Sequence, residues 1–523
     1  MKLKNLLSLM LAAAMLLTCI PAYAEPSPER ETLTILMADD SLVTDFKDNA
    51  FTQYLEEAMN VNLEFILLPQ SEAATKLQIM IASGEELPDV INYNLDVSTV
   101  YAYAQAGAII PLDEYYETQS VNLRGVVEAH PEYRIMEAIL APDGHLYSIP
   151  SYLSELHSYV AARCWINETW LKNLNLQMPT TPDEFYQVLK AFKEQDANGN
   201  GDPDDEIPMI GAWTGMRSTY NVLIFLMNAF CQADFMNFLT LENDTVGVAY
   251  NTEGWREGLK FVHKLVAEGL IDPASFTQDG TQYGAVCDNN GEGCIVGCYT
   301  VQTIKPNYTE EFTALPPLTG PEGVQGARYT PATASNRWFV TSDCKNPELA
   351  FKLGDFIFNE DVFKRIRLGV EGEDWLAPEE GAESIYPGCD AEYISVNDMW
   401  NDPQNHTWRQ SGPIFSVTTL QGEAATETTT LRSIKNAQGV MEYIKYAYPE
   451  GTYIPFMNYT EEENYQISDI LNSLNTYVSE CMVRFATGDM DIEKEWDAYL
   501  AELDNIGLQT YLKVTQDAYN RTK

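Results

Sequence analysis

The sequence predicts an α/β fold, because short apolar strands alternate with helices along its first hundred residues. The runs at 32–37 and 61–68, and a third one that begins at Pro88, have the length and composition of buried strands. Helical patterns at 46–59 and 76–83 separate them. Such alternation is typical of a parallel or mixed sheet with helices packed on its faces.

Length and charge limit the classes of function and the number of domains that this chain can have. The chain has 523 residues, 77 acidic and 32 basic side chains and a net charge of −45. This excess of acid argues against a nucleic-acid partner, because phosphate contacts need clustered Lys and Arg. Apolar and aromatic contents of 45% and 11% are those of a globular chain. The length predicts two or more domains.

Residues 1–24 have the three parts of a secretory signal peptide. Two lysines begin it, an apolar run at 6–20 follows, and Ala22-Tyr23-Ala24 supplies the cleavage site. We expect cleavage after Ala24, which moves the net charge from −45 to −47. Lipid attachment at Cys19 is the alternative. Because no other apolar run approaches the roughly 18–20 residues of a membrane span, we expect an exported protein that is extracellular, cell-surface or periplasmic.

A capped amphipathic helix is predicted from Thr181. Thr181 and Glu184 have the spacing of a capping box, and Pro182 takes the first helical position, where no amide donor is lost. The apolar side chains that follow recur at i, i+3, i+4 and i+7 and form one core-facing stripe: Phe185, Val188, Leu189 and Phe192.

The loop 196–206 that follows this helix is a predicted calcium site. Oxygen-bearing side chains stand at alternate positions, and glycines at 199 and 201 allow tight turns between them. Calcium takes six to eight oxygen ligands, and an EF-hand loop also needs glycine at its sixth position. Position twelve is Ile207 instead of glutamate, so two of three consecutive acids must close the site. The candidate ligands are Asp196, Asn198, Asn200, Asp202, Asp204, Asp205 and Glu206. A solvated acidic turn is the alternative.

Eight cysteines remain after cleavage at Ala24. Cys287, Cys294 and Cys298 cluster without a nearby histidine and fit no zinc template. One disulfide within the cluster and a set of small buried thiols are both compatible with this spacing.

Four segments resemble the extracellular solute-binding proteins of ABC importers, most closely their large oligosaccharide-binding branch. The segments are WINETWLKNLNLQMPTTPDEFYQVLKAFKEQDANGNG with the later DEIP, KLQIMIASGEELPDVI, GAIIPLDEYYE and DGHLYSIP. Members of this branch carry a calcium loop at the first segment. They have one residue fewer before the acidic pair, so the resemblance leaves open whether Asp204–Asp205 or Asp205–Glu206 closes the site.

The resemblance implies a two-lobe fold of the periplasmic-binding-protein type (type II), in which each lobe is a mixed sheet flanked by helices and hinge crossings join the lobes. The expected division is a signal peptide at 1–24, lobe 1 at 25–150, lobe 2 at 151–335 with the loop 196–206, a return to lobe 1 at 336–415 and a return to lobe 2 at 416–523. It also implies a monomer that captures an oligosaccharide or other small solute by hinge closure and delivers it to membrane permease subunits, without catalysis.

Candidate ligand-binding residues follow from the chemistry of a sugar. A pyranose has an apolar face, on which aromatic rings stack, and a rim of hydroxyls that amides, carboxylates and Arg can bind. Candidates at predicted strand ends, hinge crossings or family-like segments are Asn94, Tyr152, Glu155, Trp213, Tyr299, Trp338, Trp375 and Arg409. Inter-lobe packing or loop burial is the competing interpretation for the tryptophans.

Two other functions stay open. A secreted glycoside hydrolase would need two carboxylates about 5–9 Å apart, which no sequence pattern can locate among 77 acids. The five histidines lie in no nucleophile or metal motif: His130, His145, His157, His263 and His406. A calcium-dependent surface binding protein without a role in transport is the third possibility.

Overall fold

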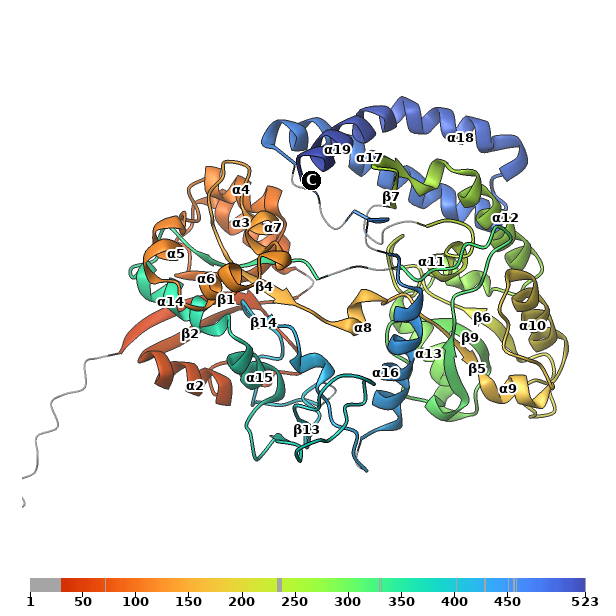
Figure 1. The fold of residues 1–523 in the computed structure, drawn as a ribbon, viewed down its shortest axis with the longest axis horizontal. Coiled ribbons are helices and arrows are strands. Elements are labelled where there is room, and N and C mark those ends of the chain that lie inside the picture. The colour runs from red at the N-terminus through yellow and green to blue at the C-terminus, as the bar shows by residue number, and fades with distance from the viewer. Residues whose placement is uncertain are drawn as a thin grey trace, which may run out of the picture.

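Two sheets of different size organise the chain. The structure, a computed structural model, describes residues 30–522 except 71, 233–237, 329, 331, 401, 428, 450, 455, 456 and 458. Within these residues, the strands form a six-stranded sheet, a four-stranded sheet and two ribbons of two strands each. Figure 1 shows the six-stranded sheet on the left, the four-stranded sheet on the right, and three C-terminal helices across the top. The fold is therefore α/β with two lobes.

The six-stranded sheet is mixed and has the order β14-β4-β11-β3-β1-β2. Strand β1 pairs in parallel with β2 and β3, and β4 pairs in parallel with β14. Strand β11 lies antiparallel between β3 and β4, which confirms a mixed sheet. The strands span Glu31–Ala38 (β1), Val61–Leu68 (β2), Val90–Leu95 (β3), Ile149–Leu153 (β4), Ser335–Val340 (β11) and Phe415–Ser416 (β14).

Both faces of this sheet are covered. Side chains alternate across a strand, so Leu36 faces one core while its neighbours Ile35 and Met37 face another. The first core is completed by α3 and α4, and the second by helices that include α2 and α14. The helices of this lobe are α2 (Ala50–Met59), α3 (Ala73–Ser83), α4 (Val97–Gln105), α5 (Asp113–Gln119), α6 (Asn122–Ala129), α7 (Ile135–Ile139), α14 (Pro347–Ile357) and α15 (Glu360–Leu368).

The first helix begins four residues later than the sequence pattern predicts. The side chain of Asn49 accepts a hydrogen bond from the backbone N–H of Phe51 at 3.0 Å, so Asn49 caps α2. Phe46 lies before this cap and is still buried in the core. Because Phe46 is apolar and buried although it lies outside the helix, the sequence pattern predicted a helix start that is too early.

The second lobe holds the four-stranded sheet, in the order β10-β5-β9-β6. Strand β5 lies antiparallel to β9 and β10, and β6 is parallel to β9. The strands span Cys164–Asn167 (β5), Ile207–Ile210 (β6), Val296–Thr300 (β9) and Phe312–Leu315 (β10). The helices here are α9 (Glu168–Asn173), α10 (Pro182–Glu194), α11 (Val222–Met227), α12 (Glu253–Ala267), α13 (Gly280–Asp288) and α16 (Leu431–Tyr443).

Helix α10 confirms the predicted stripe, because Phe185, Val188, Leu189 and Phe192 are all buried. Its cap differs in one bond. The Thr181 hydroxyl accepts from the N–H of Glu184 at 3.2 Å, as expected. The Glu184 carboxylate, however, accepts from the backbone N–H and hydroxyl of Thr180, one residue before the cap. The carboxylate thus satisfies a donor just outside the helix.

The C-terminal helices are α17 (Glu461–Thr487), α18 (Ile492–Ile506) and α19 (Leu508–Thr522). The sequence pattern predicts two helices in this part of the chain, at 461–487 and at 491–513. The structure breaks that segment at Gly507, whose φ is 121°. This left-handed value is strained for any residue except glycine, so the chain turns there. Helix α17 packs against α12, α18 and α19.

Several short elements complete the fold. The ribbons are β12 (Trp375–Leu376) with β13 (Ile394–Ser395), and β7 (Leu239–Glu242) with β8 (Thr245–Val248). The short helices are α8 (Leu156–Tyr159), η1 (Pro131–Tyr133), η2 (Ala249–Asn251), η3 (Pro273–Phe276), η4 (Asn289–Gly291), η5 (Thr309–Glu311), η6 (Thr419–Gln421) and η7 (Ile444–Tyr446). Within the described part of the chain, no helix has the length and apolar character that a membrane crossing requires.

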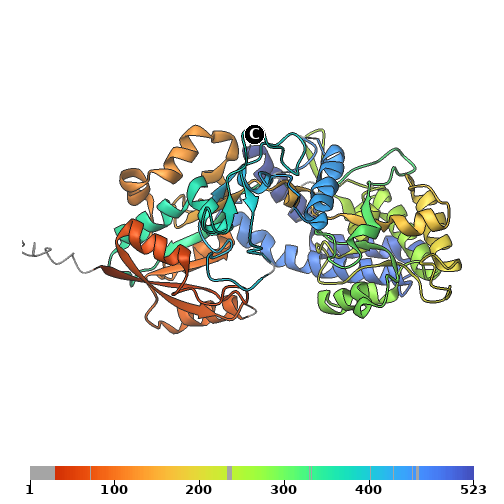
Figure 2. The ribbon, with the colours of Figure 1, turned by 90° about the horizontal axis from the view of Figure 1, so that it is seen from below.

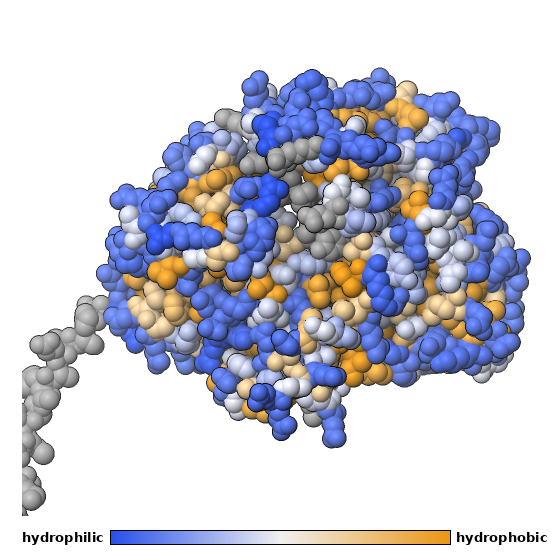
Figure 3. Space-filling model, viewed as in Figure 1, coloured by the Kyte–Doolittle hydropathy of each residue, from blue (hydrophilic) through white to orange (hydrophobic). Residues whose placement is uncertain are grey.

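The strands of the large sheet show where the chain passes between the lobes. It leaves the large sheet after β4, returns to it at β11 and leaves it again after β14. Figure 2 shows the lobes side by side from below, with α17 spanning the space between them. Figure 3 shows a mostly hydrophilic surface on the face drawn, as expected from a net charge of −45. The connecting segments between β4 and β5 and between β14 and α16 lie beside the candidate site.

Candidate functional site

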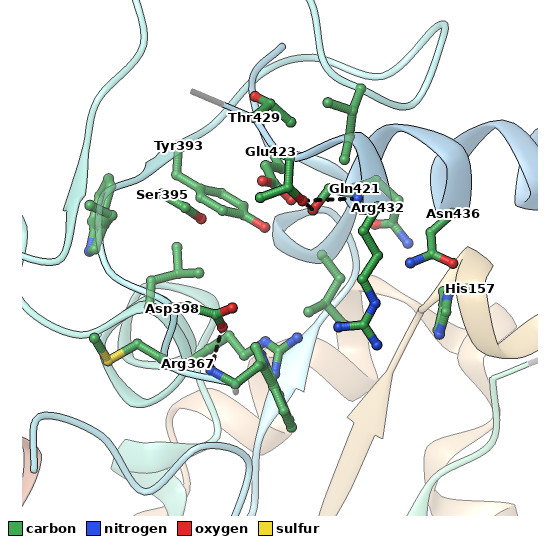
Figure 4. A pocket seen from close by; sticks show the side chains of 18 of the residues that line it. His157, Arg367, Tyr393, Ser395, Asp398, Gln421, Glu423, Thr429, Arg432 and Asn436 are labelled. Carbon is green, nitrogen blue, oxygen red and sulfur yellow. Dashed lines mark hydrogen bonds between the residues drawn. The ribbon is translucent and has the colours of Figure 1, made fainter. Parts of the chain in front are cut away.

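A cavity of about 940 Å³ lies where segments of both lobes meet. The four-stranded lobe contributes residues within 155–158, 302–306 and 430–436, and the six-stranded lobe contributes residues within 367–375 and 409–410. Loop residues within 385–400 and 420–429 complete the wall. Figure 4 shows that side chains such as Tyr393, Asp398, Glu423 and Arg432 converge on it from different segments. The site is thus assembled from parts that lie far apart in the sequence.

The pocket wall combines carboxylates with guanidinium groups. The lining acids are Glu155, Asp374, Asp398 and Glu423, and the lining arginines are Arg367, Arg409 and Arg432. Burial raises the pKa of the Glu423 carboxyl, Asp398 raises it further, and Arg367 opposes both. Burial also lowers the pKa of Arg367 to about 10, while Glu155 counteracts that shift. These charges therefore lie in a poorly solvated space where each affects its neighbours.

Trp400 stands between two arginines. The guanidinium carbon of Arg367 lies 3.5 Å from the Trp400 ring centroid, and that of Arg409 lies 4.3 Å from it. Arg409 also donates from Nη1 to both carboxylate oxygens of Asp40, at 2.9 and 2.7 Å. Since two cations contact this ring, Trp400 positions arginines rather than offering an open face for a ligand.

Asp374 organises the turn that presents Trp375. Its carboxylate is fully buried, accepts from the N–H of Val370 at 2.7 Å and lies 2.7 Å from Nδ1 of His406. Gly369 has a φ of 89°, and a Cβ there would lie 2.3 Å from an Asp374 oxygen. Only glycine therefore fits at position 369. The turn that it allows precedes Trp375, which lines the cavity.

His157 is a neutral hydrogen-bonding group at the pocket edge. Its Nδ1 lies 3.1 Å from Nη2 of Arg163, and its Nε2 lies 3.2 Å from Oγ1 of Thr303. Arginine can only donate, so Nδ1 accepts and Nε2 carries the proton. Burial, together with the charges of Arg163, Arg367 and Arg432, holds the pKa of His157 well below 6.5.

The structure places the predicted ligand-binding residues unevenly. Glu155, Trp375 and Arg409 line the cavity. Asn94 is exposed on β3, and Trp213 packs against the core of the four-stranded lobe. Neither residue lines the cavity.

The other three candidates are core residues. Tyr152, Tyr299 and Trp338 have exposed fractions of 5%, 1% and 0%. Tyr152 stacks on Tyr133 with ring centroids 4.9 Å apart, and Trp338 donates from Nε1 to the Ala350 carbonyl at 3.0 Å. Tyr299 lies on β9, between β5 and β6, where both sheet faces are covered. These side chains are corrected here from ligand-binding candidates to packing residues.

Most of the pocket wall was not predicted. Arg367 lies at the end of α15, and Tyr393, Gln421, Glu423 and Arg432 lie within 376–460, where the sequence predicts mostly loops with short elements. Isolated bridges such as Tyr393 with Glu423 hold these loops together. Such pairing leaves no periodic signal; only the density of polar and aromatic residues in this segment could have pointed to it.

The loop 196–206 is folded around its own carboxylates. The Asp205 carboxylate accepts from the side-chain amides of Asn198 and Asn200 at 3.0 and 2.7 Å. Asp196 accepts from the N–H of Gly201 at 3.0 Å, and Glu206 accepts from that of Ala197 at 2.8 Å. Asn200 and Asp202 each accept a backbone N–H two residues on, and Asp204 is exposed. The loop therefore closes with Asp205 and Glu206 turned inward.

Two oxygens of this loop are buried without a partner in the described chain: Oδ1 of Asp196 and Oε2 of Glu206. Burial raises the pKa of Glu206. Unpaired buried carboxylate oxygens are costly, and the donor set is all oxygen, so these residues fit a hard cation such as calcium. The described residues contain no group of three or more His, Cys, Asp or Glu already arranged around a metal position.

All eight cysteines of the described chain are free thiols. The disulfide that the spacing of Cys287, Cys294 and Cys298 allowed is not formed. Burial raises the pKa of the Cys287 and Cys294 thiols to about 12, so both are inert hydrophobic groups here.

Known proteins share this architecture. The family model of the bacterial extracellular solute-binding proteins matches residues 40–362. The fructooligosaccharide ABC transporter substrate-binding protein FusA of Streptococcus pneumoniae is 30% identical over 521 residues, covering 95% of this chain and 91% of FusA.

Solved structures agree with this. FusA in complex with kestose superposes with a TM-score of 0.77 and 26% identity, covering 94% of this chain and 99% of FusA. An EF-hand mutant of FusA in complex with fructo-nystose gives 0.77 and 27% over the same shares. The fold alone is also shared with the HMO-binding solute-binding protein of Bifidobacterium longum infantis, at a TM-score of 0.79, 21% identity, and 94% and 99% coverage. The chain therefore belongs to the family of bacterial extracellular solute-binding proteins.

Proposed function

We propose that this protein is the substrate-binding component of an ABC importer, and that it captures an oligosaccharide in the 940 Å³ cavity and delivers it intact to membrane permease subunits. The observation that carries the proposal is the cavity itself, which places aromatic rings, carboxylates, amides and arginines together between the two lobes. The likeness to FusA along almost the whole chain supports the same function.

The lining chemistry suits a sugar. Trp375, Tyr386 and Tyr393 offer ring faces or edges to apolar C–H groups, and Glu155 and Gln421 offer oxygens to hydroxyls. Small-molecule pockets usually measure about 300–1,000 Å³, so this cavity lies near the upper end and has room for several sugar rings. A ligand of that size would contact both lobes at once.

Capture by closure follows from that geometry. We propose lobe 1 at 30–150 and 336–415 and lobe 2 at 151–335 and 416–522; each boundary falls within a strand of the six-stranded sheet, namely β4, β11 and β14. A ligand that contacts both lobes binds the closed form more tightly and shifts the population toward it. The permease would then receive the closed, loaded form. We propose that the protein is a monomer. We also propose that it has no nucleic-acid partner, because a net charge of −45 disfavours contacts with phosphate groups.

We also propose that calcium braces the loop of lobe 2. The residues that would hold it are Asp196, Asn198, Asn200, Asp202, Asp205 and Glu206, and the two unpaired buried oxygens support this set. A bound cation would supply charge that offsets the clustered carboxylates. Loops of extracellular type bind calcium with a dissociation constant of about 10⁻⁴–10⁻³ M.

Export completes the proposal. The predicted signal peptide, with cleavage after Ala24 or lipid attachment at Cys19, lies outside the described residues. Membership of an extracellular family supports a location outside the cell membrane. N-terminal sequencing and intact mass of the exported protein would distinguish the two processing routes.

A panel of neutral and acidic oligosaccharides tests the function. We expect one or more to raise the melting temperature and to be recovered intact by chromatography after incubation. Failure of every saccharide to bind would contradict the proposal. Cleavage of a bound saccharide would instead favour the glycoside hydrolase, for which the raised pKa of Glu423 would suit a general acid.

A further inference from the structure

Three segments of the four-stranded lobe meet at one end of the cavity. They are the start of α8 with Glu155 and His157, the loop after β9 with Gln302 and Thr303, and α16 with Asn436. Figure 4 shows His157 and Asn436 at this end of the cavity. Hydrogen bonds among these segments determine which polar atoms remain for a ligand, and whether each of those atoms donates or accepts.

Asn436 offers a donor to the cavity. Its Oδ1 atom accepts from the backbone N–H of Ile304 at 2.9 Å. Exchanging the amide oxygen and nitrogen would set two donors against each other, so Nδ2 is the atom that remains. Within the described residues Nδ2 has no partner, and it is not among their buried unpaired atoms. An accessible N–H group of a cavity-lining residue is therefore open to a ligand oxygen.

Arg163 holds the first two segments together from below the cavity wall. The residue is fully buried and donates from Nη1 to the carbonyl oxygens of His157 and Val160, at 3.1 and 2.8 Å. Nη2 donates to the Gln302 carbonyl and, at 3.1 Å, to Nδ1 of His157. Because an arginine can only donate, Nδ1 of His157 must accept, and the imidazole proton lies on Nε2.

This tautomer fixes the direction of the Thr303 hydroxyl. Nε2 of His157 lies 3.2 Å from Oγ1 of Thr303 and donates to it. The Thr303 proton therefore cannot point toward His157, and the hydroxyl has no other partner among the described residues. Thr303 is half-buried and lines the cavity. Its hydroxyl is thus left as a donor to a ligand oxygen.

Two acceptors border these donors. Nε2 of Gln302 lies 3.3 Å from Oγ of Ser158, which in turn donates to Oε2 of Glu155 at 2.7 Å. The single Ser158 proton is used on Glu155, so Gln302 must donate to Ser158 and keep Oε1 open. Oε1 of Gln302 and Oε1 of Glu155 have no partner in the described chain and are not buried unpaired atoms. Both residues line the cavity.

We propose that this end of the cavity is a hydroxyl-binding subsite, in which Thr303 and Asn436 are specificity-determining donors and His157 is the positioning residue that fixes the direction of the Thr303 hydroxyl. Sugar hydroxyl oxygens accept from the two donors, and their protons go to Gln302 or Glu155. The subsite requires a hydroxyl group, whether or not the saccharide carries a charge elsewhere. This inference rests on the proposed saccharide-binding function and goes further by naming the atoms and the direction of each bond.

Titration calorimetry with the full mature chain tests the two donors. The probe is the tightest binder among kestose, nystose, maltotriose, cellotriose and trigalacturonate. Thr303→Val removes the hydroxyl at nearly constant size and should weaken this probe by roughly tenfold. Thr303→Ser keeps the hydroxyl and should bind nearly as tightly as wild type. Thr476→Val is the matched control, since the Thr476 hydroxyl is exposed and donates to the Asn472 carbonyl within α17.

Asn436→Asp reverses the polarity of one atom. The aspartate can still accept from the N–H of Ile304, but an acceptor replaces the Nδ2 donor. A ligand-binding role therefore predicts a loss of affinity of roughly tenfold or more, whereas a purely structural role predicts none. Asn346→Asp is the control, since Oδ1 of Asn346 also accepts a backbone N–H, that of Leu349 at 3.1 Å, and Asn346 does not line the cavity.

Nitrogen-15 NMR of the imidazole tests the positioning role of His157, with the His157→Gln spectrum identifying its signals. We expect a neutral ring protonated on Nε2, with and without the probe. Protonation on Nδ1 would make Thr303 the donor to His157 and would overturn the assignment of Thr303.

Melting temperatures show which variants fold. If Thr303→Val does not fold, Thr303→Ala takes its place with the same expected loss of affinity. If Asn436→Asp does not fold, the Thr303 variants and the His157 spectrum still decide the subsite. Wild-type affinity in a folded variant of either donor would overturn the role of that residue and leave the saccharide-binding function standing. Failure of every probe to bind the wild-type chain would overturn both.

Discussion

Arg409 donates from Nη1 to both carboxylate oxygens of Asp40, at 2.9 and 2.7 Å, although 369 residues separate the two. Asp40 follows β1, an interior strand, and Arg409 precedes β14, an edge strand of the same sheet. Nη2 of Arg409 also donates to the Trp400 carbonyl at 3.2 Å. This one ion pair therefore ties the first part of lobe 1 to the loop that supports the pocket.

Breaking that ion pair should loosen the pocket. In Asp40→Asn, the partly buried Arg409 loses its charged partner, and the support of Trp400 and Arg367 weakens. We expect saccharide affinity to fall several-fold and the melting temperature to fall slightly, since such charged hydrogen bonds contribute about 1.5–3 kcal/mol. Asp517→Asn, which breaks an exposed pair with Lys513, is the control and should change neither.

Stability and affinity should separate at two tryptophans. Trp338 is fully buried and donates to the Ala350 carbonyl, so Trp338→Phe should lower the melting temperature by several degrees and leave affinity unchanged. Trp375 is half-buried on the cavity wall, so Trp375→Ala should weaken saccharide binding about tenfold or more with a smaller change in melting temperature. Calorimetry and thermal melts on both variants check this. The reverse pattern would show that the pocket is misplaced.

Calcium should stabilise lobe 2. Chelation should lower the melting temperature of wild-type protein, and added calcium should restore it. Glu206→Gln should abolish this response, because it removes the negative charge of the carboxylate whose Oε2 atom is unpaired. Asp204→Asn is the matched control in the same loop, where Asp204 is exposed and should be dispensable. A melting temperature that does not change with chelator would argue against a structural cation. Equal loss of the calcium response in both variants would argue against closure of the site by Asp205 and Glu206.

The neutral His157 predicts a pH effect on stability. Its pKa is held well below the ordinary 6.5, so the unfolded chain binds a proton at mildly acidic pH that the folded chain does not. The resulting stability is fully present above pH 6.5 and is lost progressively as the pH falls below it. His157→Gln should therefore show a smaller drop in melting temperature between pH 7.5 and 5.5 than wild type. His130→Gln, an exposed control, should follow wild type.

Local sequence signals predicted local structure well. The stripe and cap of α10 and the first three strands follow from spacing within one element, so the sequence contained them. The split at Gly507 was missed because a helix can contain glycine, and only its φ of 121° ends this one. The sequence left open whether Asp204 or Glu206 joins Asp205 in the proposed calcium loop. Spacing along the chain does not show which of these side chains turns inward.

The pocket was harder to predict for two reasons. Trp338 and Tyr299 lie on interior strands whose two faces are both covered, so an aromatic at a strand end has no face to offer a ligand. Tyr393 and Glu423 meet through an isolated bridge between loops thirty positions apart in the chain. Non-local pairing of irregular segments carries no periodicity, and so only Glu155, Trp375 and Arg409 of the candidates reached the cavity wall.

The most direct test of the central claim is hydrogen–deuterium exchange of the full mature chain with and without its best-binding saccharide. The account predicts new protection in peptides from both lobes that border the cavity, namely 153–160, 301–307, 366–376, 392–400 and 419–437. Protection confined to one lobe, or located away from these segments, would contradict capture of a saccharide between the lobes.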